Sequence, residues 1–144
     1  MMGKFYQILC ASILLCVSLP TIAEQFQDFG NLQVHYIALP STFITPNIAK
    51  HYGIKRSKYT GVINITVLDK TAKLKAVSAE LTGSGDNLLG QSQVLEFKTI
   101  VEGDAIYYIA TYPFGNEEIV NFKIKINSQN KTNILKFQHK FYVD

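Results

Sequence analysis

The chain has 144 residues, 14 basic and 11 acidic side chains, and a formal net charge of +3 at pH 7. That charge is too small to predict nucleic-acid binding. The length allows one adequate hydrophobic core and leaves no room for a second domain.

Residues 1–23 are predicted to be a secretory signal peptide. Lys4 supplies a short positive start, residues 5–19 are largely apolar, and Pro20 ends that stretch shortly before the small residue Ala23. The apolar stretch is short for a membrane-spanning helix, which needs about 20 residues. We therefore expect cleavage after Ala23 and no membrane span in the mature domain, which comprises residues 24–144.

Both cysteines lie in the predicted signal peptide. Leu9 precedes Cys10 and Leu15 precedes Cys16, whereas lipid attachment needs a small residue before the cysteine, so a lipoprotein is not expected. The mature domain has no cysteine and can form no disulfide, although an exported protein lies in an oxidising compartment. Hydrophobic burial must therefore stabilise it.

The mature domain begins with a lead-in and one strand. Residues 25–30 are polar and aromatic, and residues 32–39 predict the first strand, which Pro40 ends because proline cannot donate to a ladder.

The one credible helix is predicted at residues 45–53. Thr45 is a suitable N-cap, Pro46 fits the first helical position, and Gly53 can adopt the left-handed conformation that ends a helix. Two turns are not stable alone, so we expect this helix to lie on the sheet.

The rest of the chain predicts strands and turns. Further strands are expected at residues 59–68, 74–81, 93–100, 105–112, 120–126 and 135–141. Residues 83–90 contain three glycines and predict a loop. With turns spaced roughly 8–12 residues apart, about seven strands predict an all-β antiparallel sandwich. Its architecture would be immunoglobulin-like without the disulfide, and an open barrel is the alternative.

The last two predicted strands form a hairpin with one buried and one wet face. If Asn127 lies opposite Thr132, Lys123 lies opposite Lys136. Like charges in that position cost a little stability, so they favour a role in solubility or edge protection, with an anionic partner as the alternative.

Three histidines are the candidate metal ligands: His35, His51 and His139. None has a second ligand at a spacing that defines a site, so we predict no metal site and no cofactor. His139 is expected to face the core, and His51 lies where a helix C-terminus favours a positive charge. A metal site that uses His35 and His139 is kept as the alternative.

Catalytic arrangements are not found either. Ser57, Ser84 and Ser92 lie in turn-like contexts without the pattern that surrounds a catalytic serine. Glu117 and Glu118 are adjacent, so on a strand they would point to opposite faces and could not form an acid–base pair. We therefore predict that the protein is not an enzyme.

Several motifs are spread along the mature domain. They are STFITP at residues 41–46, RSKY at 56–59, NLLGQ at 87–91, EGDAIYYIA at 102–110, NEE at 116–118 and KFYVD at 140–144. Together they resemble a family of small exported proteins of gammaproteobacteria, whose domain has no known function. The resemblance implies a Gram-negative source and a periplasmic location. It implies no reaction and transfers no catalytic residue.

We accordingly expect a periplasmic binding or interaction module of the cell envelope. The expected partner is another envelope protein or a small ligand, and the alternative is a small-ligand or metal carrier. The hypothesised surface joins the helix and its basic exit to the loops at residues 87–91 and 113–118. Its polar and aromatic candidate residues are Tyr52, Arg56, Lys58, Asn87, Gln91, Asp104 and Glu117. The same residues also fit roles in turns and caps, and the sequence leaves the oligomeric state open.

Overall fold

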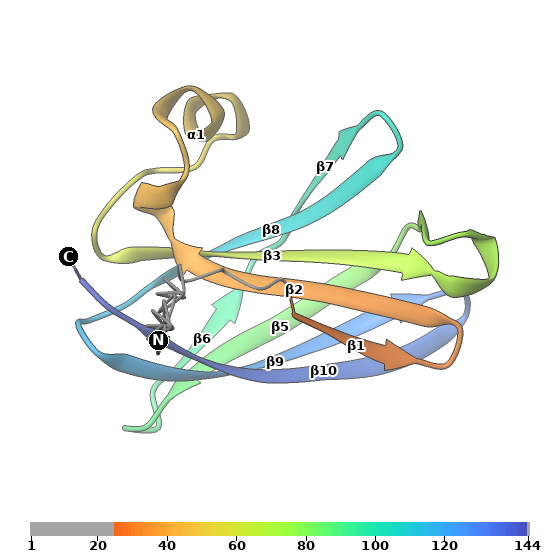
Figure 1. Ribbon diagram of the computed structural model, residues 1–144. Coiled ribbons are helices and arrows are strands. Elements are labelled where there is room, and N and C mark those ends of the chain that lie inside the picture. The colour runs from red at the N-terminus through yellow and green to blue at the C-terminus, as the bar shows by residue number, and fades with distance from the viewer. Residues whose placement is uncertain (1–24, 144) are drawn as a thin grey trace, which may run out of the picture.

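The computed structural model describes residues 25–143, so the predicted signal peptide, its cleavage site and both cysteines lie outside the described residues. The described chain forms two antiparallel β-sheets that pack face to face (Figure 1). The predicted sandwich of immunoglobulin-like architecture is therefore confirmed. It has ten strands where about seven were expected.

Sheet A is the larger sheet. In spatial order it contains β1 (Gln25–Phe29), β2 (Leu32–Pro40), β3 (Thr60–Asp69), β8 (Ala105–Pro113) and β7 (Lys98–Glu102), and the short β4 (Lys75–Ala76) also pairs with β3. Sheet B contains β10 (Lys131–Phe141), β9 (Glu118–Ser128), β5 (Glu80–Asn87) and β6 (Ser92–Leu95), in that order.

The core lies between the sheets and is built from the alternate residues that face inward. Its largest fully buried side chains include Phe122, Phe141, Ile63, Ile65, Ile124 and Leu135. This arrangement follows directly from the period-two alternation of the strands.

The predicted helix is confirmed as α1 (Pro46–Tyr52), which follows the 3₁₀ turn η1 (Ser41–Phe43). Gly53 ends α1 with a left-handed φ of 68°, as expected, whereas the N-cap Thr45 makes no side-chain capping bond. Under the helix, Ala49 and Ile54 pack against Val62 of β3 and form a small second core on the outside of sheet A.

The loop predicted at residues 83–90 is wrong, because β5 continues to Asn87. Two glycines in this strand allow close approach. A Cβ at Gly85 would lie 2.6 Å from the Tyr112 ring and 2.9 Å from the Phe122 ring, and a Cβ at Gly83 would lie 2.7 Å from the Lys123 carbonyl oxygen. Glycine here makes room for neighbours and does not mark a turn.

Three further predictions also differ from the structure. Residues 93–100, predicted as one strand, contribute to two strands, β6 and β7, which belong to different sheets. Residues 74–81, also predicted as one strand, contain the short β4 and only the start of β5, and a second 3₁₀ turn, η2 (Lys70–Ala72), precedes them. The lead-in at residues 25–30 contains β1. Val77 and Phe97 lie in two of these breaks although both residue types favour strands, so residue preferences alone do not reveal a change of sheet.

The register predicted for the last hairpin is confirmed. Thr132 pairs with Asn127, and Lys136 pairs with Lys123. The intervening turn places Asn130 at φ 59°, in the left-handed region that tight hairpin turns require and that asparagine tolerates. The outward side chains of β9 and β10 are thereby fixed relative to one another.

Candidate binding surfaces

Two connections that lie far apart in the sequence meet at one end of the sandwich. They are residues 87–91, between β5 and β6, and residues 113–118, between β8 and β9 (Figure 1). The Glu118 carboxylate joins them, because Asn87 Nδ2 donates to its Oε1 at 3.2 Å and the Gly115 N–H donates to its Oε2 at 2.6 Å. A single carboxylate thus ties one turn to the other.

Asn87 also holds its own turn in place. Its Oδ1 accepts hydrogen bonds from the backbone N–H groups of Leu89, at 3.0 Å, and Gln91, at 2.9 Å. Its Nδ2 donates to Gln91 Oε1 at 2.8 Å. Asn87 and Gln91, both predicted as surface residues, therefore stabilise this turn by hydrogen bonds. A structural role in turns was the alternative to binding that the sequence allowed.

The braced turn presents two leucines to solvent. Leu88 is 68% exposed and Leu89 is 85% exposed, and together they are called the leucine tip here. A hollow of about 360 Å³ lies beside them, lined also by Gly115 and Glu118. The NLLGQ motif was identified in the sequence, but its two leucines were not selected as candidate residues. The available signal was an apolar pair inside an otherwise polar, glycine-rich segment.

Glu117 and Glu118 take different roles in the adjoining turn. Glu117 is exposed and has a φ of 58°, whereas Glu118 makes the bonds that join the two turns. The sequence analysis placed the loop at residues 113–118 on the surface but named Glu117, and not Glu118, as its candidate residue. Both residues are alike in type, so only the turn geometry separates them.

The basic exit of α1 is fastened to the preceding 3₁₀ turn. The buried Ser41 Oγ donates to the Ser57 carbonyl and accepts from the Ser57 N–H, each at 2.9 Å. Arg56 Nη2 donates to the Thr42 carbonyl at 3.0 Å. Arg56 thus has a structural bond of its own, while Lys58 is exposed and makes no ion pair within residues 25–143.

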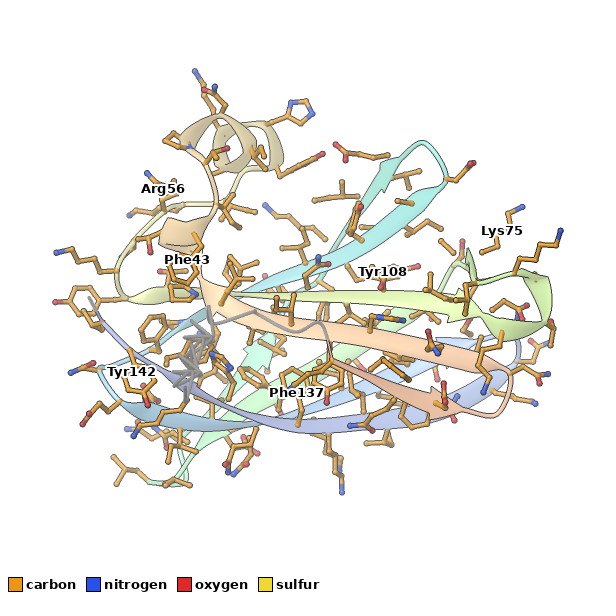
Figure 2. All side chains as sticks on the ribbon, viewed as in Figure 1. Phe43, Arg56, Lys75, Tyr108, Phe137 and Tyr142 are labelled. Atoms are coloured by element: carbon orange, nitrogen blue, oxygen red, sulfur yellow. The ribbon has the colours of Figure 1, made fainter. Side chains whose placement is uncertain are left out.

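The other two predicted surface residues lie on the outside of sheet A, away from the leucine tip. Tyr52 lines a hollow of about 340 Å³ between α1 and β7. Asp104 follows β7 and lines a separate hollow of about 640 Å³ beside Lys75 of β4. Figure 2 shows Arg56 and Lys75 near opposite ends of the molecule. The seven predicted residues are therefore divided among several places and do not form one surface.

The two candidate metal-binding histidines face different ways. His35 lies on the outward face of sheet A, where its ring stacks on Phe26 at 5.3 Å and a 2.7 Å hydrogen bond joins its Nε2 to Gln33 Oε1. His139 lies on the inward side of β10, with its ring edge-on to Phe141 at 4.5 Å. Burial lowers the pKa of His139. Among residues 25–143, no three potential ligands of the His, Cys, Asp and Glu types cluster as a metal site would need.

Two tyrosines, Tyr108 and Tyr112, place their hydroxyl groups in or near the core. Burial raises the pKa of Tyr108, whose hydroxyl accepts from the Ala79 N–H at 2.7 Å and donates to the Val77 carbonyl at 3.3 Å. Burial also raises the pKa of Tyr112, and the nearby carboxylate of Glu118 adds to that rise. Both phenols therefore stay neutral near pH 7.

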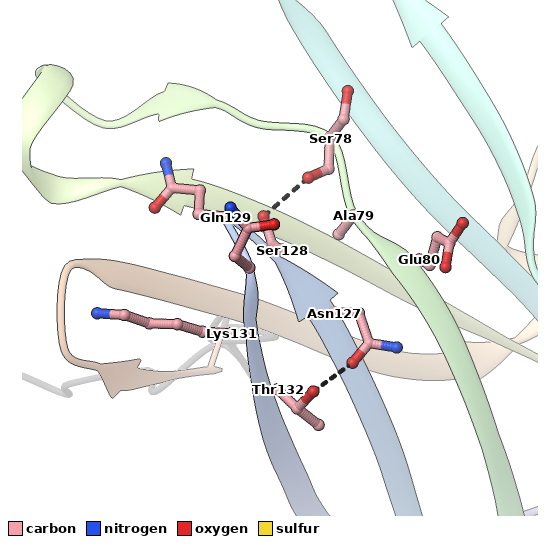
Figure 3. Close-up of a pocket in the computed structure, with 9 residues that line it drawn as sticks. Ser78, Ala79, Glu80, Asn127, Ser128, Gln129, Lys131 and Thr132 are labelled. Carbon is pink, nitrogen blue, oxygen red and sulfur yellow. Dashed lines mark hydrogen bonds between the residues drawn. The ribbon is translucent and has the colours of Figure 1, made fainter.

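A hollow of about 550 Å³ lies beside the β9–β10 turn (Figure 3). Two hydrogen bonds hold polar side chains that line this hollow. Ser128 Oγ donates to the Ser78 carbonyl at 2.8 Å, and Thr132 Oγ1 donates to Asn127 Oδ1 at 2.6 Å. The Ser128 bond fastens the hairpin to the chain before β5, and the Thr132 bond joins the two strands of the hairpin. Within the described part of the chain, no helix is long and apolar enough to span a bilayer.

Comparison with known proteins gives one sequence family and a set of similar folds. The model of DUF4426, a domain of unknown function, matches residues 26–144. A crystal structure of a DUF4426 protein from Pseudomonas aeruginosa is 38% identical and has a TM-score of 0.75, and the match covers 84% of this chain and 96% of that one. No curated protein matches the chain.

Two structures of FetP from uropathogenic Escherichia coli share the fold. One is a copper-bound variant with a TM-score of 0.61, and the match covers 95% of that chain. The other was expressed in the periplasm and has a TM-score of 0.57, and the match covers 94% of that chain. Each is 12% identical to this chain over 83% of its length. At that identity the likeness concerns the fold alone.

Proposed function

The chain belongs to the DUF4426 family, and from that premise we propose that it is a periplasmic, non-enzymatic binding module that docks a protein of the cell envelope through its leucine tip. The observation that carries this proposal is the exposure of Leu88 and Leu89 on a turn whose backbone is held in place by hydrogen bonds to Asn87. Binding would bury this apolar surface, which is favourable, without the added cost of ordering the loop first.

The surroundings of the tip favour a protein partner. The carboxylates of Asp86, Glu117 and Glu118 lie on or next to the two joined turns, and neither turn contains a lysine or arginine. An acidic setting is repelled by an anionic membrane surface. It suits a partner that offers an apolar pocket with basic groups at its rim.

The periplasmic location rests on the predicted signal peptide and on the resemblance of the motifs. It gains support from the fold shared with FetP, one structure of which was expressed in the periplasm. The direct check is the N-terminus of the protein purified from its native envelope. We expect that N-terminus to be Glu24. An N-terminus that still contains residues 1–23 would contradict export by cleavage.

The docking proposal is tested by site-specific photocrosslinking in the native cell. A photoreactive amino acid at position 89 should give one reproducible protein adduct. The matched control position is 101, since Val101 is 65% exposed but lies on the β7–β8 hairpin. The adduct from position 89 should disappear with Leu88→Ser. Adducts of equal yield from both positions, or none from position 89, would refute the docking site.

A metal-carrier function is the second reading, because the FetP variant that shares the fold holds copper. The placement of His35 and His139 on different faces speaks against it in this chain. Titration of the purified protein with Cu²⁺ and Zn²⁺ separates the two functions. Micromolar binding that both His35→Gln and His139→Gln abolish would favour the carrier.

A further inference from the structure

The outward face of sheet B carries a cluster of basic side chains, and we propose that this face docks on a bilayer surface rich in anionic lipid headgroups. The cluster, called the lysine face here, consists of Lys123, Lys125, Lys136 and Lys140. This inference goes beyond the docking of a protein at the leucine tip and rests on different residues.

The register of β9 and β10 places these charges close together. Lys123 is directly opposite Lys136, and Lys125 is the next outward residue along β9. Neighbouring strands lie about 5 Å apart, and outward residues along a strand repeat every 7 Å or so. Lys140 extends the row along β10, where its Nζ lies 5.2 Å from the centre of the exposed Tyr142 ring.

The protein does not neutralise these charges itself. None of the four lysines makes an ion pair within residues 25–143. Two outward carboxylates of β5, Glu80 and Asp86, lie toward the two ends of the face, opposite Asn127 and Asn121. The positive charge of the face is therefore available to a partner.

Placing Lys123 directly opposite Lys136 costs stability, since like charges on paired strands repel. Solubility alone does not require that placement. The outward face of sheet A supplies a comparison, because the outward positions of its long strands hold one lysine, Lys98. The strands of sheet B thus present a denser row of lysines outward than the strands of sheet A, whose outer side carries basic residues such as Lys50 and Lys55 on α1 and its exit.

Apolar side chains among the lysines distinguish a membrane from a soluble anion. Ile134, which pairs with Lys125, is 38% exposed, and Val94 at the β6 edge is 74% exposed. A sheet face that mixes lysines with aliphatic groups fits the boundary between headgroups and acyl chains, where lysine stems lie along apolar surface and their amines reach the phosphates. A free phosphate would gain nothing from Ile134 or Val94.

The test is binding of the purified protein, expressed as the full chain, to lipid vesicles. Vesicles of phosphatidylglycerol mixed with phosphatidylcholine should bind the protein, and binding should weaken as salt rises. Lys123→Gln with Lys136→Gln should lower the apparent affinity about thirtyfold. The control is Lys50→Gln with Lys55→Gln, which removes the same charge from two exposed lysines of α1 and its exit. It should bind nearly as well as the unchanged protein.

Three results would overturn the inference. They are no binding to phosphatidylglycerol vesicles, equal losses in the two double variants, and displacement by inorganic phosphate that exceeds the effect of sodium chloride at the same ionic strength. The last result would assign the face to soluble anions. Because the assay contains no other protein, its failure leaves the docking of a protein at the leucine tip untouched.

A second measurement locates the contact. An environment-sensitive dye on Ile134→Cys should shift its emission to shorter wavelength with anionic vesicles. The same dye on Glu102→Cys, at the far end of β7, should not. Equal shifts at both positions would contradict docking through sheet B, even if vesicles bind.

Discussion

The outward faces of the two sheets differ in what covers them. On sheet A, α1 lies over Val62 and the half-buried Ile109, and a small second core fills the space between helix and sheet. On sheet B nothing within residues 25–143 covers the outward row, which is polar and rich in lysine. The alternation of a strand thus tells which residues point outward, while the chemistry of those residues tells whether a further layer lies there.

The largest effect should come from the covered face. Ile54→Ala removes a buried side chain that holds the exit of α1 against Val62, and we expect the free energy of unfolding to fall by about 2–4 kcal/mol. Equilibrium unfolding in urea measures it. The matched control is Ile134→Ala on the open face, which should cost less than about 1 kcal/mol. Equal losses would mean that burial under α1 adds no stability beyond that of an exposed strand position.

A smaller effect, of opposite sign, should come from the open face. Lys136→Glu replaces a repulsive pair with an attractive one, because residue 136 lies directly opposite Lys123. We expect the free energy of unfolding to rise by roughly 0.2–1 kcal/mol at low salt, and this gain should shrink at high salt. Lys125→Glu makes the same charge change opposite Ile134 and should stabilise less. A loss of stability in Lys136→Glu would contradict the repulsion.

The smallest effect concerns the inward side of the strand that carries Lys136. Burial lowers the pKa of His139 in the folded protein. Below about pH 6.5, the ordinary pKa of histidine, the unfolded chain therefore binds a proton more readily than the folded protein does. The stability linked to this histidine is fully present above that pH and is lost as the pH falls through the folded pKa. Urea unfolding across this pH range should show the loss, and His139→Gln should reduce it. An unchanged pH profile in His139→Gln would assign the loss to other groups.

Much of the fold could be predicted because its signals are local. The alternation of apolar and polar residues predicted the register of β9 and β10, and Pro46 with Gly53 predicted α1. The course of β5 could not be predicted, since Gly83 and Gly85 lie in a strand only because rings and backbone from elsewhere approach them. These contacts join residues that are distant in the sequence, so the residues around Gly83 and Gly85 do not indicate them.

The candidate surface was harder to predict than the fold. The motifs containing Asn87 and Gln91 were identified, but only the structure places Glu118 beside them and shows both residues bonded within the turn. Tyr52 and Asp104 were grouped with them by residue type, and the structure puts them beside other hollows. Residue type suggests what a side chain can do. Which residues act together depends on pairings between strands distant in sequence.

The order of strands in sheet B bears on when the protein can fold. β5 pairs with β9, which follows it only after β6, β7 and β8, and β9 also carries the whole length of β10. Until β9 and β10 have been synthesised, the inward residues of sheet A have little to pack against. Whichever compartment the chain folds in, a part of it that ends before β9 therefore cannot complete the core, because the pairing of β5 with β9 joins segments distant in the sequence.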